Sequence, residues 1–184
     1  TTVTSATGSI SVTGVGFSGD GVDVSSAAVV ASTGTATITI GGTSTAADQA
    51  GVRLQGTNTQ ITSVDGDVSI TGTNNSNLGA FVTSGVEISS TGTGASAATI
   101  TITGTGDAGI DLDTADTLVT SVDGEILLDG NANTLEGVLI ADATISSTGT
   151  TVDAATVTLD GSSDGAVSVQ LDNGSTVTSV AGNI

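Results

Sequence analysis

The stretch VTSVDGEILLDG, from Val119 to Gly130, is one of four similar stretches that begin 58 residues apart along the chain. The others are VTSATGSISVTG from Val3, ITSVDGDVSITG from Ile61 and VTSVAGNI from Val177. A repeat of this length, rich in Val, Ile, Thr and Gly, indicates stacked structural units rather than a globule with one central core.

Each 58-residue repeat divides into two halves of about 29 residues, and each half holds three short segments in which aliphatic and polar residues alternate. Such alternation is typical of strands with one buried face. The first segments carry Ile10/Val12, Ile38/Ile40, Val68/Ile70, Ile100/Ile102, Ile126/Leu128 and Val157/Leu159. The second segments carry Val22/Val24, Val52/Leu54, Ala80/Val82, Ile110/Leu112, Val138/Ile140 and Val169/Leu171. The third segments carry Val3, Val30, Ile61, Ile88, Val119, Ile145 and Val177.

Glycines separate these segments, and we expect them to allow sharp turns or positive φ. Those that follow the first segments are Gly14, Gly41, Gly72, Gly104, Gly130 and Gly161. Equivalent segments in successive halves would pair in parallel. The predicted fold is therefore all-β, a parallel β-helix (β-solenoid) of about six three-strand coils, doubled into 58-residue repeats. We expect residues 1–184 to form a single solenoid that is a segment of a longer repetitive chain.

The composition restricts the function. Nineteen carboxylates face one cation, Arg53, and the formal net charge is −18. A chain this acidic is poorly suited to bind nucleic acid or anionic membrane surfaces. No apolar run approaches the roughly 20 residues that a membrane span needs. With no Cys, His or Lys, the chain offers no disulfide, thiolate metal site or ordinary base for a serine nucleophile, so we predict that it is not an enzyme.

The Thr- and Gly-rich, lysine-free tandem runs, such as VTSATGSISVTG from Val3, resemble the repeats of large secreted bacterial surface proteins. Filamentous haemagglutinins and autotransporter passengers are the families that they resemble most. The resemblance extends over the whole chain and implies a right-handed β-helix, export to the extracellular space or cell surface, and a role as a stalk, adhesin or matrix component.

Four carboxylates crowd one half-repeat and are the candidate calcium ligands: Asp107, Asp111, Asp113 and Asp116. Calcium prefers several oxygen ligands, which carboxylates supply. Two acidic turns, Asp65/Asp67 and Asp123/Glu125, recur 58 residues apart, but they would lie too far apart to share an ion. The alternative is a solvated acidic surface without bound metal. No other cofactor is expected.

Three polar features remain. A serine follows two residues after each third-segment aliphatic, and we expect an inward hydroxyl ladder from Ser5 to Ser179. Arg53 shares an outward position with Asp23 and Phe81, so a contact with Asp23 is expected. Threonine pairs such as Thr37/Thr39 suggest ice binding, but the intervening coils break the array with Asp67 and Glu125.

The predicted function is structural: a rigid surface fibre, sheath or matrix filament built by coil stacking, with the chain itself as principal partner. One alternative is an adhesin stalk or binding module that contacts a glycan or host surface through loops such as 73–78 or 131–135. A second is a calcium-dependent assembly protein.

Overall fold

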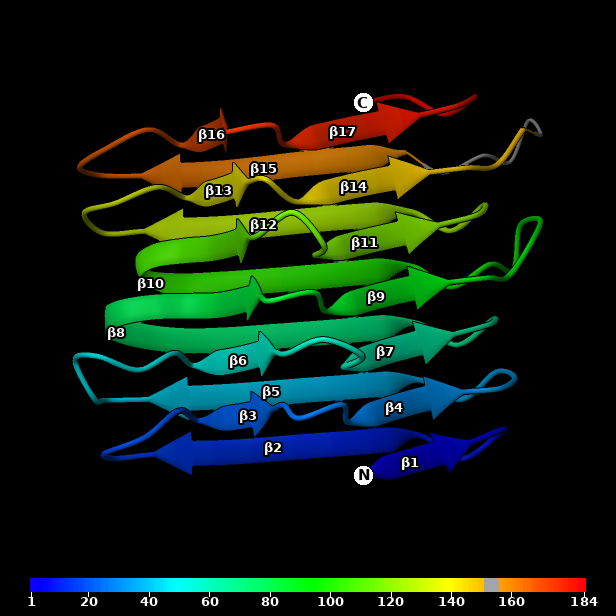
Figure 1. Cartoon of the computed structure of the whole chain (residues 1–184), viewed down its shortest axis with the longest axis horizontal. Helices are drawn as coiled ribbons and strands as arrows, with labels where there is room; N and C mark the ends of the chain where they lie inside the picture. Colours follow the sequence, from blue (N-terminus) through cyan, green and yellow to red (C-terminus); the bar gives the residue numbers. More distant parts are fainter. Residues whose placement is uncertain (151–155) are drawn as a thin grey trace.

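In the computed structural model, which describes residues 1–150 and 156–184, the chain winds into a β-solenoid of about six coils (Figure 1). Every pair of named strands in the described residues is parallel, as the repeat predicted. Those residues contain no helix. The two termini lie at opposite ends of the stack (Figure 1). The right-handed sense and the 58-residue doubling stay predictions.

The strands form three columns. Column one holds β2 (Ile10–Gly16), β5 (Ile38–Ser44), the first part of β8 (Val68–Thr83), the first part of β10 (Ile100–Asp113), β12 (Ile126–Ala132) and β15 (Val157–Ser163). Column two holds β3 (Val22–Val24), β6 (Val52–Gln55), the last parts of β8 and β10, β13 (Val138–Ala141) and β16 (Val169–Asp172). Column three holds β1 (Thr2–Ser5), β4 (Val29–Ser32), β7 (Gln60–Ser63), β9 (Glu87–Ser90), β11 (Leu118–Ser121), β14 (Thr144–Ser147) and β17 (Thr176–Ser179). Each coil runs through columns three, one and two, so coil 1 contains β1, β2 and β3.

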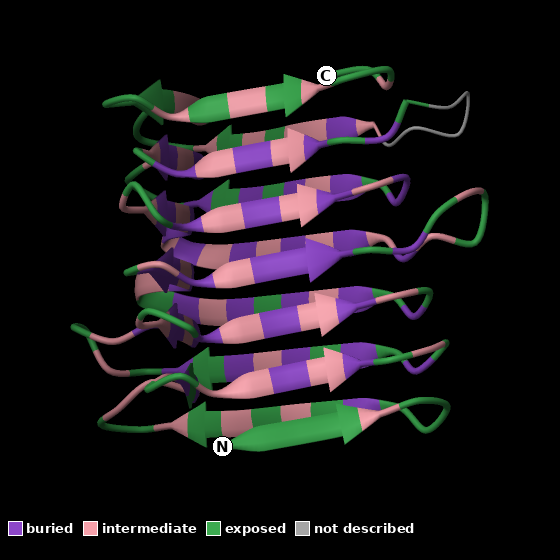
Figure 2. Ribbon diagram, turned by 45° about the vertical axis from the view of Figure 1, so that its right-hand side comes forward, coloured by how far each residue is buried: buried purple, intermediate pink, exposed green. Residues whose placement is uncertain are grey.

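The predicted aliphatic positions line the interior. Val68, Leu112 and Val119 are each at most 1% exposed, and most strands of the central coils alternate buried and outward residues (Figure 2). Burial declines at both ends of the stack. Val3 is 44% exposed and Leu171 is 55% exposed, because neither has a coil on its outer side.

The glycines after the first segments are not corner residues with positive φ, contrary to the sequence prediction. They lie inside column-one strands and pair with one another along the stack, and the member in coil 2 is Gly42 rather than Gly41. A Cβ on Gly104 would lie 2.0 Å from the carbonyl oxygen of Gly109, where the same strand returns as column two. These glycines are therefore required by a close backbone approach that narrows the interior.

The corner between columns two and three uses a backbone conformation that the sequence prediction missed. In each coil the residue two positions after the last aliphatic of column two has positive φ: Ser26 (59°), Gly56 (96°), Ser84 (63°), Thr114 (79°), Asp142 (59°) and Asn173 (54°). Only one of these six is glycine. Four coils have a second positive-φ residue at the same corner: Ala27, Asn58, Gly85 and Gly174. Asn and Asp tolerate this left-handed region, whereas β-branched Thr114 is strained there.

Candidate functional site

The four calcium candidates lie at three different places. Asp107 is at the corner of columns one and two, where its backbone carbonyl accepts hydrogen bonds from Thr134 and Leu135. Asp116 is exposed in the turn between β10 and β11. Asp111 and Asp113 share the outward side of β10, but the described residues contain no group of three or more acidic side chains arranged to hold a metal ion. Calcium binding at these residues stays a prediction.

The structure raises the pKa of Asp111. Its ladder neighbours are Phe81 in coil 3 and Leu139 in coil 5, both apolar, and its Oδ1 is buried without a hydrogen-bond partner. Burial, and then the charges of Asp113 and Glu136, raise its pKa from 3.8 to about 6. A carboxylate in this position is disfavoured while it is charged.

Asp111→Asn is therefore expected to stabilise the protein at pH 7–8. The folded pKa lies above the unfolded value, so the wild-type chain loses stability as the pH rises from about 4 to about 7. With partial solvent screening, we expect the variant to gain about 1–3 kcal/mol at pH 8 and almost nothing at pH 4. Urea unfolding followed by circular dichroism at both pH values measures this difference. Exposed Asp116→Asn is the control, and an equal gain in both variants would refute the effect of burial.

The acidic turns between columns three and one support the neighbouring backbone. Asp67, in coil 3, accepts a hydrogen bond from Thr99 N through Oδ1 at 2.9 Å. Asp123, in coil 5, accepts one from Gly94 N through Oδ2 at 2.8 Å and is only 8% exposed. The long turn 93–99 of coil 4 is thus held from the coils on both sides. The equivalent long turn of coil 6 lies largely outside the described residues.

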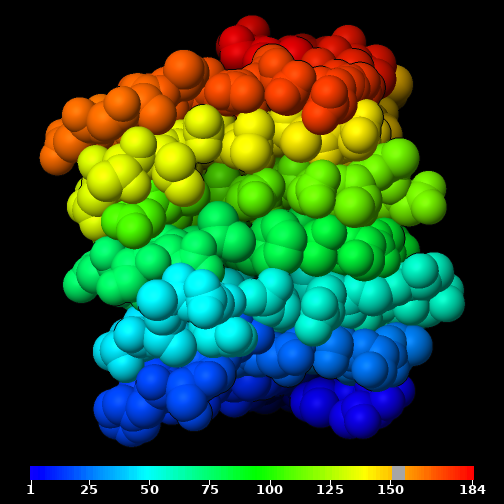
Figure 3. All heavy atoms as spheres, turned by 60° about the vertical axis from the view of Figure 1, so that its left-hand side comes forward, coloured from blue at the N-terminus to red at the C-terminus, as the bar shows by residue number. Residues whose placement is uncertain are grey.

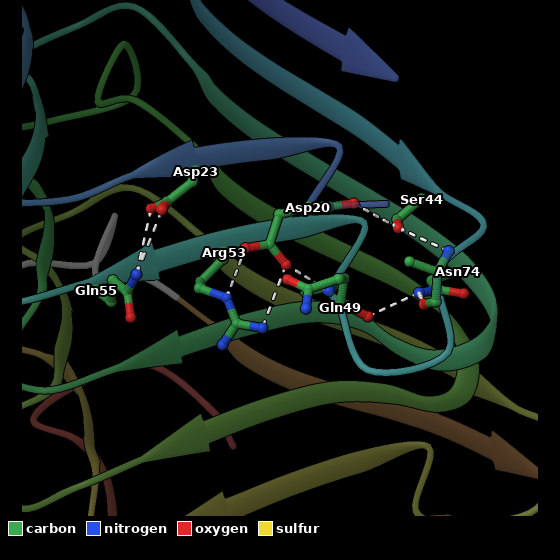
Figure 4. Close-up of polar contacts among 10 residues, drawn as sticks. Asp20, Asp23, Ser44, Gln49, Arg53, Gln55 and Asn74 are labelled. Atoms are coloured by element: carbon green, nitrogen blue, oxygen red, sulfur yellow. Dashed lines mark hydrogen bonds and ion pairs between the residues drawn. The ribbon is translucent and has the colours of Figure 1, made fainter. Parts of the chain in front are cut away.

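Arg53 is the ladder neighbour of Asp23, as predicted, but the carboxylate that it binds is that of Asp20. Its Nε and Nη2 donate to Asp20 at 2.8 and 3.2 Å (Figure 4). Its guanidinium also lies over the Phe81 ring, 5.1 Å from the centroid. Asp23 instead accepts from Gln55 Nε2. The prediction placed Arg53 in the correct column, but Asp20 reaches it from the adjacent corner. The pair ties coil 1 to coil 2.

Asn74 is a structural residue that the sequence analysis did not single out. It is fully buried, and its Nδ2 donates to the carbonyl oxygens of Ala46 and Gln49 at 2.8 and 2.6 Å (Figure 4). Ser44 donates in the same way to Gly19 O of coil 1. A polar side chain at this ladder position therefore donates hydrogen bonds to the corner of the preceding coil. The segment 73–78, proposed as an adhesin loop, is part of β8, whereas Asn131, Asn133 and Leu135 of the other loop are exposed.

The predicted inward serines of column three are buried from Ser32 to Ser147, where each is at most 3% exposed. Ser32, Ser63 and Ser147 donate to the corner carbonyls of Gly34, Gly66 and Val122. The hydroxyls of Ser90 and Ser121, neighbours in the ladder, are buried without a partner. Their burial keeps these hydroxyls away from any large substrate.

Twelve outward-facing residues of column one in coils 1–4 form a surface without an ionisable side chain, which we call the neutral face. Its residues are Ser11, Thr13, Val15, Thr39, Gly41, Thr43, Ser69, Thr71, Thr73, Thr101, Thr103 and Thr105. In coils 5 and 6, Asp129 and Asp160 continue the row that Thr103 occupies in coil 4. Most other carboxylates lie at the corners or on column two, so the charge of −18 is distributed unevenly.

No protein-family model, curated protein or solved structure matches this chain. The described residues also include no helix of the length and hydropathy needed to cross a membrane.

Proposed function

We propose that this chain is a structural element of an extracellular fibre, sheath or matrix filament, in which stacked coils form a rigid rod. The observation that carries the proposal is the regular register of each column from coil to coil. Ile10, Ile38, Val68, Ile100, Ile126 and Val157 follow one another in a single ladder. Columns two and three are aligned in the same manner, and the one register shift in the described residues lies between Gly106 and Ala108, at the corner of coil 4. In the space-filling view, successive parts of the chain lie directly on one another as layers (Figure 3).

The energetics favour such a rod. Each coil buries about six aliphatic side chains against the coils on either side, and its strands hydrogen-bond to those same coils. A single coil without neighbours would lose both contributions. The outermost coils expose Val3 and Leu171, which a further coil of the same design would bury. Stability therefore grows with the number of stacked coils.

The surface suits a role outside the cell, which the resemblance to secreted surface proteins also supports. Trypsin-like proteases cut after Lys and Arg, and Arg53 is the one such residue. Arg53 lies in β6, and its side chain is 17% exposed and paired with Asp20. An exposed fibre with this sequence would resist these proteases while its carboxylates keep it hydrated.

X-ray fibre diffraction and electron microscopy of native surface material test the proposal. Strands perpendicular to the rod axis should give a meridional reflection near 4.8 Å, from filaments that an antibody to this chain labels on intact cells. Labelling only inside the cell, or only discrete particles outside it, would refute the proposal. Disassembly by EDTA would instead support the calcium-dependent alternative.

A further inference from the structure

We propose that the neutral face is a lateral docking surface for a second copy of this chain, with Phe17 of one copy inserted into the hollow at Gly41 of the other. This contact is sideways, so it goes beyond the stacking of coils along the rod. It rests on three observations: a hollow, an exposed aromatic side chain and the absence of charge.

The hollow arises because Gly41 interrupts a row of threonines. Thr13 lies on one side in the ladder and Thr71 on the other, and both line the hollow. The methyl group of Thr13 would lie 3.8 Å from a Cβ built on Gly41, so this methyl faces the missing side chain. Val15 and Gly42 add apolar surface to an open volume of about 470 Å³. Pockets of this size hold ligands larger than a phenyl ring.

Phe17 is the side chain on the molecule best suited to fill such a hollow. It is 82% exposed, more than any other large hydrophobic residue among those described. It follows directly after β2, whose Val15 lines the hollow. The second aromatic, Phe81, lies under Arg53. Exposed aromatic residues commonly anchor protein interfaces, whereas a monomer gains nothing by leaving one in water.

Charge directs a second copy to the neutral face rather than to the other surfaces of the molecule. Two chains that each carry −18 repel one another, and the repulsion is smallest where neither presents a carboxylate. Along column two, Asp23, Asp111 and Asp113 would meet like charges. Opposed neutral faces bring together hydroxyl and methyl groups instead. A twofold contact places each Phe17 against the other copy's hollow and uses both anchors at once.

Two variants test the contact in the whole chain. Phe17→Ser removes the anchor, and Gly41→Thr fills the hollow while restoring the threonine row. Threonine at position 41 meets no atom closer than 3.8 Å at its Cβ and favours strands, so we expect this variant to fold as well as the wild type. Val167→Ser is the matched control, because Val167 is 51% exposed and lies five coils away.

Sedimentation equilibrium over a range of concentrations is the measurement, at low and at high salt. We expect the wild type to dimerise, more strongly at high salt because the repulsion is screened. Each test variant should weaken the dimer by about tenfold or more, and the control should not. A wild type that stays monomeric at millimolar concentration, or dimers insensitive to both test variants, would overturn the proposal. If Gly41→Thr rods still lengthen in electron micrographs but no longer pair side by side, the lateral contact is distinct from the stacking of coils.

Discussion

Replacing Gly104 with alanine is expected to destabilise the protein by about 3–5 kcal/mol or to prevent folding. The added methyl carbon would lie 2.0 Å from Gly109 O and 2.5 Å from Gly109 C. These are backbone atoms of the same strand, and they cannot rotate away as a side chain would. Relief requires the two halves of β10 to separate, and Gly72 and Gly130 in the adjacent coils make the same close contact. Overpacking that moves backbone is among the costliest single changes.

Gly41→Ala is the matched control for this variant. The two glycines are both in column-one strands, but the nearest atom to a Cβ at position 41 is 3.8 Å away. Alanine there should be neutral or stabilise the fold by up to about 1 kcal/mol, because it restricts the unfolded chain. Thermal and urea unfolding of the two variants measures the difference in their stability. Equal free energies of unfolding for the two variants would show that the close backbone approach at Gly104 does not limit the size of its side chain.

Truncation of Ile102 to alanine is expected to cost about 2–5 kcal/mol, the second-largest effect. Ile102 is fully buried in coil 4 and stacks in the ladder between Ile70 and Leu128. No large side chain can move in to fill the cavity, because the neighbouring coils are identical in design and already packed.

Leu159→Ala, in the same column at coil 6, should cost less than half as much. Leu159 is only partly buried, since it packs against Leu128 on one side and has no described coil beyond it. The ratio of the two losses, measured by denaturant unfolding, reports how strongly stability depends on neighbours on both sides. Equal losses at Ile102 and Leu159 would contradict the one-dimensional model of stability.

The three columns could be predicted from the sequence because a strand with one buried face leaves a direct record in its residue types. Ile102, Leu112 and Val119 each belong to a different column, and all three are buried as the alternation indicated. Parallel pairing followed from the recurrence of equivalent segments about every 29 residues. These features depend on local pattern and repetition, which a single chain displays fully.

The remaining features depend on distances that the pattern does not encode. A glycine needed for close approach, such as Gly104, has the same letter as one needed for a turn. The left-handed corner residues escaped detection because Ser84 and Thr114 are not residue types that signal positive φ. The ladder position of Arg53 beside Asp23 was predicted, but its ion pair with Asp20 was missed because it depends on the conformation of the corner. The hollow at Gly41 results from the ladder alignment of Gly42, one residue away from the expected position.

The parallel ladders also determine how the molecule would respond to tension. Their hydrogen bonds run along the stacking axis, so a pull at the two termini opens an end coil first rather than shearing all coils at once. Each coil of about 29 residues that peels away releases roughly 100 Å of extended chain. Under tension, such a rod would lengthen stepwise and dissipate energy at each step, and it would rewind on the remaining coils once the force is removed.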